Sequence, residues 1–192
     1  MSTVINGVDY GPLAQLIGKW VGNKGLDNAP DAQANPDKTA FTDEIVFTVS
    51  GPAENAEAQN LVSVQYHHVV RKLDNGCIFH DQIGHWIYEK STNIIMHSLS
   101  IPRAVCLLAG GKYHEHNGES LFHVKATAGS QTYGIVQSPF MLEKAKTKAF
   151  TLQLSVKGDE LHYNEVMSLH IYGKDFEHTD TSTLLRVTYD QG

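Results

Sequence analysis

Hydrophobic and polar residues alternate along most of the chain, and a stretch near its end shows the pattern most clearly. In residues 161–171, one face of an extended strand would carry Leu161, Tyr163, Glu165, Met167, Leu169 and Ile171. The opposite face would carry polar side chains, which include His162 and His170. A period of two with one apolar face predicts a β-strand that is buried on one side and hydrated on the other.

Similar runs follow one another through the rest of the chain and predict a series of short strands. The expected strands cover residues 19–26, 41–49, 61–70, 77–88, 94–101, 104–109, 120–128, 131–137, 147–156, 161–171 and 182–189. Asn75-Gly76 and Gly158-Asp159 are typical of tight hairpins. Residues 27–38 and 51–60 are expected to be polar or soft connections, the first of them over a barrel mouth, and Gly110-Gly111 is expected to end a strand.

A short helix is expected over residues 10–18, because Pro12 suits a first helical position and Gly18 a stop. Residues 140–146 fit either a loop or a helical turn. About ten strands, tight turns and no βαβ alternation predict an all-β fold, an antiparallel up-and-down β-barrel with a short N-terminal helix. A β-sandwich with the same turn spacing would look similar. A barrel of this size encloses packed side chains or one small ligand.

Length and charge narrow the class of protein further. At 192 residues the chain suits one domain, which we expect to span residues 1–192 with a core at about 13–189. Because it has neither a long apolar run nor a basic, apolar leader, we expect a cytoplasmic protein without a membrane partner. A formal charge of -6 without a Lys and Arg cluster also argues against nucleic acid. The oligomeric state is left open, a homodimer included.

Several chemical sites can be weighed from spacing alone. Cys77 and Cys106 form no CxxC pair, which excludes a zinc ribbon, and we expect them to be buried free thiols. His114-Glu115-His116 has the wrong spacing to Glu119 for the metal site of a double-stranded β fold, and we expect a solvated turn. No serine lies in a Gly-x-Ser-x-Gly elbow. Glu165 is the only acid expected on an inward face, which indicates a hydrogen bond or ligand contact and not a hydrolase dyad.

Two segments carry the candidate binding residues. His178 follows the strand that points Met167 inward, in a stretch from Gly173 to Asp180 that breaks the alternation. We therefore expect it in a loop at the barrel rim, as a single axial ligand of an enclosed planar cofactor or as an ordinary exposed histidine. The second segment places His80, Gln82, Gly84, Trp86 and Tyr88 on one face of a strand. A glycine beside a tryptophan there indicates a close approach of a ring or a ligand to the backbone, or equally a tryptophan that packs over the glycine within an ordinary core.

The order and spacing of several blocks resemble the nitrobindin family of haem-binding β-barrels, whose fold is similar to fatty-acid-binding proteins and lipocalins. The blocks are residues 13–25 with Pro30, residues 41–47, residues 80–86, and residues 161–167 with His178. The resemblance covers nearly the whole chain. Gln82 and Ile87 stand where the family tends to have Glu and Arg, and residues 98–111 depart from its usual pattern, so the chain resembles a divergent branch.

The resemblance implies roles for particular residues. His178 falls on the proximal histidine that ligates haem iron, His80 on a distal histidine and Met167 on a pocket methionine. Trp20 and Arg186 resemble the pair in which an arginine covers a tryptophan at the closed end of the barrel, where cation–π attraction favours the contact.

Two functional hypotheses follow, and they belong to different classes. The first is a ferric haem protein with haem b held by His178 as its metal ligand, with His80, Met167, Trp86, Gln82 and Arg103 as further cofactor-binding candidates. Its open iron site would take nitric oxide, and the family resemblance adds peroxynitrite isomerase-like chemistry. The second is a metal-free carrier of a fatty acid or other small hydrophobic ligand, with Arg103 as a carboxylate anchor if it faces inward. A lumen filled by its own side chains is a third option.

Overall fold

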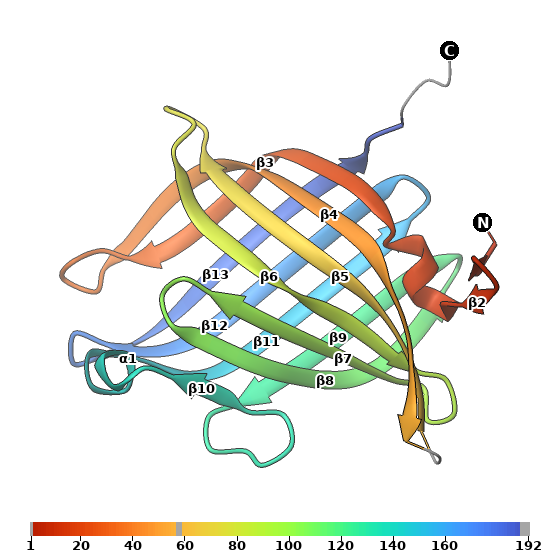
Figure 1. Ribbon diagram of the computed structural model, residues 1–192. Coiled ribbons are helices and arrows are strands. Elements are labelled where there is room, and N and C mark those ends of the chain that lie inside the picture. The colour runs from red at the N-terminus through yellow and green to blue at the C-terminus, as the bar shows by residue number, and fades with distance from the viewer. Residues whose placement is uncertain (1, 57–58, 189–192) are drawn as a thin grey trace.

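The computed structural model describes residues 2–56 and 59–188, and its strands wind into a closed barrel (Figure 1). The short strands β1 (Val4–Ile5) and β2 (Val8–Asp9) and the 3-10 helix η1 (Gly11–Gln15) precede the barrel. The other elements are β3 (Gly18–Pro30), β4 (Pro36–Ala56), β5 (Gln59–Lys72), β6 (Ile78–Glu89), β7 (Ile94–Ile101), β8 (Val105–His116), β9 (Glu119–Thr127), β10 (Ile135–Gln137), α1 (Pro139–Lys144), β11 (Ala145–Lys157), β12 (Glu160–Ile171) and β13 (Lys174–Arg186).

Ten of these strands form the ring. Each strand from β3 to β9 pairs with the next along the chain, β9 pairs with β11, and β11 to β13 continue the meander. The antiparallel pairing of β13 with β3 then closes the barrel. The expected up-and-down antiparallel barrel of about ten strands is therefore confirmed. The strand β10 lies outside the ring, on the first part of β8.

Alternation along the strands separates the interior from the solvent, as the sequence pattern predicts. On β12 all six residues expected to face inward, from Leu161 to Ile171, are buried. On β6 the face that carries His80, Gln82, Trp86 and Tyr88 also points inward. The interior is apolar near the end where η1 packs, and more polar toward the opposite end.

The end covered by η1 is sealed by Trp20 and Arg186. Trp20 is fully buried, and the guanidinium carbon of Arg186 lies 4.1 Å from the centre of its ring. Arg186 also donates hydrogen bonds to the backbone oxygens of Ile17 (2.6 Å) and Gln15 (2.8 Å). The helix end, the first barrel strand and the last one are thus tied together at one point, as the expected tryptophan–arginine pair requires.

Several strands are longer than their apolar patterns indicate, which corrects three expectations. Residues 27–38 are not a long loop, because β3 and β4 extend as a polar hairpin to Pro30 and Pro36. The expected connection over residues 51–60 is likewise mostly strand, since β4 continues to Ala56 and β5 begins at Gln59. The chain does not stop at Gly110-Gly111 either, since β8 runs on to His116. At Gly111 a side-chain carbon would lie 1.9 Å from the backbone oxygen of His123, so glycine allows neighbouring strands to approach here.

Other expectations change in detail. The 131–137 strand is reduced to β10, while the ambiguous 140–146 stretch forms α1, whose Ser138 cap accepts a hydrogen bond from the Met141 amide. The segment 114–116 is exposed but belongs to β8 and not to a turn. Both cysteines are exposed, because Cys77 follows a hairpin turn and Cys106 lies on the outward face of β8. The expected last strand ends at Arg186, and its final position, 189, lies outside the described residues. Within residues 2–56 and 59–188, no helix is long and apolar enough to cross a bilayer.

Replacing Arg186 with lysine should weaken the seal of the barrel. A lysine keeps the charge but loses the planar stacking surface and the forked hydrogen bonds, so the free energy of unfolding should fall by about 1–3 kcal/mol. Urea denaturation followed by tryptophan fluorescence measures the change. The exposed Arg71 provides the matched control, since Arg71→Lys should have almost no effect. Equal stability of the two variants would show that the Arg186 contacts contribute nothing specific.

Candidate functional site

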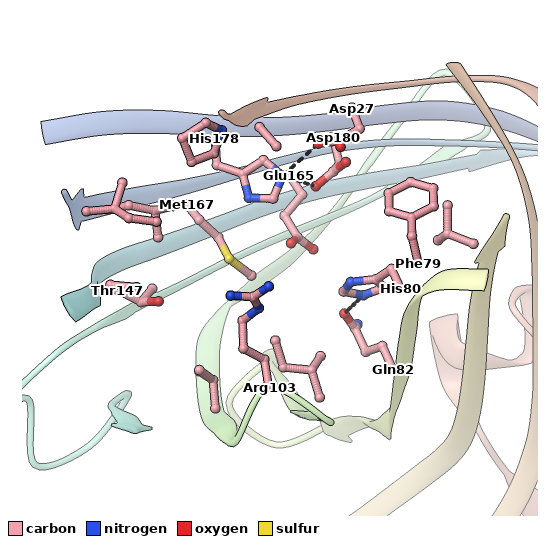
Figure 2. Close-up of a pocket in the computed structure, with 18 of the residues that line it drawn as sticks. Asp27, Phe79, His80, Gln82, Arg103, Thr147, Glu165, Met167, His178 and Asp180 are labelled. Carbon is pink, nitrogen blue, oxygen red and sulfur yellow. Dashed lines mark hydrogen bonds and ion pairs between the residues drawn. The ribbon is translucent and has the colours of Figure 1, made fainter. Parts of the chain in front are cut away.

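A cavity of about 280 Å³ opens at the barrel end opposite the Trp20–Arg186 seal. Its volume is just below the range of about 300–1,000 Å³ that is usual for small-molecule sites. Most of its wall is apolar, with Phe41, Val70, Phe79, Ile101, Val105, Met141, Ala145, Met167, Leu169 and Ile171 among the lining residues. Most of its polar side chains form two groups, one on β3, β12 and β13, and one on β5 and β6, while Arg103 and Thr147 lie apart from both (Figure 2).

Three carboxylates form a row across adjacent strands of the first group. Glu165 on β12 is directly opposite Asp180 on β13, and Asp180 is directly opposite Asp27 on β3. Asp27 faces inward because the pairing shifts register between Gly22 and Gly25, which turns the odd-numbered residues of the distal half of β3 toward the lumen. The expectation that Glu165 is the only inward acid is therefore wrong.

His178 lies in β13, opposite Met167, and not in a rim loop. The inward positions of β13 around it include Asp180 and Ser182, so the strand shows no apolar alternation that could have predicted it. The side chain of His178 is only 24% exposed, and its Nε2 lies 2.7 Å from Asp27 Oδ1 and 3.2 Å from Asp180 Oδ2. In the described part of the chain, its other ring nitrogen, Nδ1, makes no hydrogen bond.

Burial changes the acid–base behaviour of this group. Burial and the neighbouring Asp180 raise the pKa of Glu165 to about 8. Burial also raises the pKa of Asp180, against the opposing effect of His178. Burial alone would lower the pKa of His178, but the hydrogen bond to Asp27 and the nearby carboxylates together raise it above its ordinary value. Glu165, Asp180 and the His178 imidazole therefore hold their protons to higher pH than the same groups would in water.

The second polar group forms a hydrogen-bonded chain that leads from the cavity toward the core. His80 Nε2 lies 3.1 Å from Gln82 Oε1, the Gln82 amide donates to the Tyr66 hydroxyl at 2.6 Å, and that hydroxyl lies 2.9 Å from His97 Nε2. Burial, with the nearby His68, lowers the pKa of His80 to about 4, and the same two causes lower that of His97 to about 3. Both imidazoles are therefore neutral near pH 7.

The structure brings five of the six expected cofactor-binding residues to one cavity, namely His178, His80, Met167, Gln82 and Arg103. Trp86 is the exception. It is buried deeper, where it stacks on His97 with 4.4 Å between ring centres and borders a separate cavity of about 30 Å³. Whether any of the six contacts a cofactor remains a prediction.

Arg103 projects from the turn between β7 and β8 toward Met167 and Glu165 (Figure 2). Its guanidinium has no ion pair or hydrogen bond with any residue in the described ranges, and the carboxylates across the cavity are beyond contact distance. An unpaired cation is thus available at the cavity mouth, as the carboxylate-anchor hypothesis requires.

The sequence offered little sign of two further polar residues. Asp43 is buried on β4, where it accepts hydrogen bonds from the Tyr163 hydroxyl and the Ser182 hydroxyl, both at 3.0 Å. His68 lies 3.4 Å from the same carboxylate. Asp43 shares the inward face of β4 with Phe41, Ile45 and Phe47. An acid at an inward position of this apolar alternation was the one feature of the sequence that could have indicated a buried polar residue here.

The fold and the cavity define an antiparallel β-barrel with an internal site of small-molecule size. The family of the THAP4-like, heme-binding beta-barrel domain matches the chain over residues 9–186. The chain therefore belongs to this family of haem-binding barrels, which confirms the resemblance seen in the sequence.

Solved structures support the same fold. The crystal structure of Rv2717c from M. tuberculosis is similar with a TM-score of 0.69 and 18% sequence identity, over 92% of this chain and 95% of that one. At this level of identity the likeness concerns the fold alone. No curated protein matches the chain.

Replacing Glu165 with glutamine should make the stability of the barrel less dependent on pH. A carboxyl whose pKa rises from 4.5 in the unfolded chain to about 8 in the barrel binds its proton more tightly in the folded state. Its stabilising contribution is complete below the lower pKa and is lost as the pH rises toward the higher one.

Between about pH 5.5 and 8, the unfolding free energy of the wild type should fall by at least about 1 kcal/mol more than that of Glu165→Gln, because one pKa unit corresponds to about 1.4 kcal/mol. Urea denaturation at several pH values measures this. Glu160, which is exposed on the same strand, is the control, and Glu160→Gln should follow the wild type. Parallel pH curves for all three proteins would contradict the assignment.

Proposed function

We propose that the protein binds ferric haem b in this cavity, with the His178 imidazole as the axial ligand. The observation that carries the proposal is the position and hydrogen bonding of that imidazole. The ring lines the cavity, and its Nε2 forms a hydrogen bond with Asp27. Histidines that ligate metals usually donate their other ring N–H to a carboxylate or carbonyl, which fixes the ring and raises its basicity. Nδ1 would be the ligating atom in this ring orientation.

The other residues of the cavity suit such a group. Its mostly apolar walls suit the hydrocarbon faces of a macrocycle, and Met167 lies beside His178 on the neighbouring strand. Arg103 offers an unpaired guanidinium for a carboxylate of the ligand. The family to which the chain belongs is a haem-binding one, which supports the same choice.

Bound haem would supply an iron centre for nitric oxide and for the isomerisation of peroxynitrite, the chemistry that the family resemblance suggests. The protein's own contribution on the opposite wall is a neutral, oriented imidazole. His80 is uncharged near pH 7, and Gln82 fixes its ring by accepting a hydrogen bond from Nε2. His80 Nδ1 is then an acceptor that can orient a donor on the ligand without adding charge.

Adding ferric haem to the purified protein should produce a shifted Soret band with one haem per chain. His178→Ala should weaken haem binding by at least about 10-fold, because it removes the proposed iron ligand. His170→Ala is the matched control, since His170 also lies on the β12–β13 hairpin and also pairs with an aspartate, but on the exposed face. A free-haem spectrum for the wild type, or equal binding by both variants, would refute the axial role.

The second candidate function is transport of a metal-free amphipathic ligand such as a fatty acid. Arg103 favours it, because an unpaired guanidinium at the mouth of a mostly apolar cavity is a natural partner for a carboxylate with an alkyl tail. Hydrogen bonds to charged groups contribute about 1.5–3 kcal/mol.

Oleate binding, measured by calorimetry, should therefore weaken about 10-fold or more in Arg103→Ala and remain unchanged in Arg71→Ala, which alters an exposed arginine. Mass spectrometry of extracts from the native protein provides a second measurement. A co-purified lipid without haem uptake would favour this function over the first, whereas haem uptake with no oleate binding would reject it.

A further inference from the structure

We propose that Asp27, His178 and Asp180 form a binding site for a divalent first-row transition-metal ion, separate from the haem iron proposed above. Each residue offers one ligand atom, and the three atoms all lie within 4.8 Å of one another. Figure 2 shows the three side chains converging at the edge of the cavity. The site uses Nε2 of the imidazole, whereas the haem proposal uses Nδ1.

The spacing of the ligand atoms is close to that of a metal site. With bonds of about 2.1 Å, neighbouring ligands of an octahedral ion are about 3.0 Å apart, and those of a tetrahedral ion about 3.4 Å. His178 Nε2 lies 2.7 Å from Asp27 Oδ1 and 3.2 Å from Asp180 Oδ2. Small rotations of the two carboxylates would admit an ion in place of the proton that Nε2 now shares with them.

The position of the three ligands is fixed by the sheet. Asp27 and Asp180 are directly paired across β3 and β13, and His178 is two residues from Asp180 on the same face of β13. Barrel strands hold side chains more firmly than loops do, so little ordering remains for the ion to impose. His178 and Asp180 are about one quarter exposed, while Asp27 is 8% exposed, which leaves the cavity as the entry path.

The charge around the site also calls for a cation. Glu165, directly opposite Asp180, is 9% exposed and projects into the cavity (Figure 2). In the described part of the chain its carboxylate has no hydrogen bond or ion pair. Neither Asp27, Asp180 nor Glu165 is paired with a Lys or Arg there. Like charges on directly opposite residues of a sheet destabilise it, so this row of acids needs protons or a cation to offset its charge, and a divalent ion would serve in place of the protons.

The donor set indicates the class of ion. Carboxylate oxygens suit hard ions such as Mg²⁺ and Mn²⁺, while an imidazole shifts the preference toward Mn²⁺, Fe²⁺, Co²⁺ and Zn²⁺. Two carboxylates would neutralise a divalent ion. Glu165 is placed to accept hydrogen bonds from water on the ion, which would explain a buried carboxylate that has no protein partner.

Titration of the metal-free, haem-free protein with Co²⁺ and Zn²⁺ tests the site. We expect one Co²⁺ per chain, visible by its d–d absorption and displaced by Zn²⁺, and a rise in Tm when either ion is added. Asp27→Asn and Asp180→Asn should each weaken binding by at least 10-fold and abolish the rise in Tm. Asp175→Asn is the matched control, because Asp175 pairs with His170 at 2.8 Å on the exposed side of the same hairpin.

The outcomes separate this proposal from the haem proposal. Wild-type-like Co²⁺ binding in both aspartate variants, or an equal loss in Asp175→Asn, would overturn the metal site and assign the binding to surface histidines. Circular dichroism checks that each variant folds. If Asp27→Asn does not fold, the test of the metal site rests on Asp180→Asn. Haem binding should survive in the folded Asp180→Asn variant and weaken in His178→Ala. Asp27→Asn is left out of this comparison, because Asp27 holds the ring of the proposed haem ligand. Loss of the Co²⁺ signal in Asp180→Asn with haem binding retained therefore supports both proposals, while failure of haem binding alone leaves the metal result standing.

Discussion

The pairing of β13 with β3 is the contact on which both the barrel and its site depend. It joins the last strand of the chain to the first strand of the ring, and it brings Arg186 next to Trp20 at one end. At the other end the same ladder sets Asp180 opposite Asp27, and therefore places His178 beside a carboxylate 151 residues away in sequence. One set of backbone hydrogen bonds thus seals the closed end and assembles the site at the open end.

The two ends of the barrel have different energetic roles. The closed end is filled with apolar and aromatic side chains, and the cation that covers it, Arg186, has a ring, two carbonyls and the carboxylate of Asp159 as partners. The cavity at the open end is lined by the acids Asp27, Glu165 and Asp180, and Glu165 has no hydrogen bond or ion pair with any of the described residues. Burying carboxylates costs several kcal/mol unless protons or counter-ions compensate. A protein that needed only a stable barrel would have filled this end with apolar residues, so we attribute its polarity to ligand binding.

The architecture could be predicted because apolar alternation is periodic and most strands show it. The site could be predicted only in part, because the residues that line it interrupt that alternation. His178 and Asp180 replace apolar residues at inward positions of β13, so the strand resembled a loop. Asp27 was missed for a second reason, since the register shift between Gly22 and Gly25 changes which face the later residues of β3 occupy. The hydrophobic pattern carries no signal for such a shift, and the partner of β3 is too distant in sequence to indicate it.

The imidazole of His178 links the two proposed occupants of the cavity. When Asp27 accepts the Nε2 proton, the ring gains electron density, and Nδ1 becomes a stronger ligand for an iron ion. A divalent ion bound at Nε2 would withdraw electron density from the same ring and weaken Nδ1 as a ligand. Because the two binding free energies are coupled reciprocally, haem bound at Nδ1 would weaken the binding of the divalent ion at Nε2 to the same extent. The row of carboxylates therefore does more than orient the histidine. Whether a proton or a metal ion is bound between these carboxylates and Nε2 determines how strongly Nδ1 can bind iron.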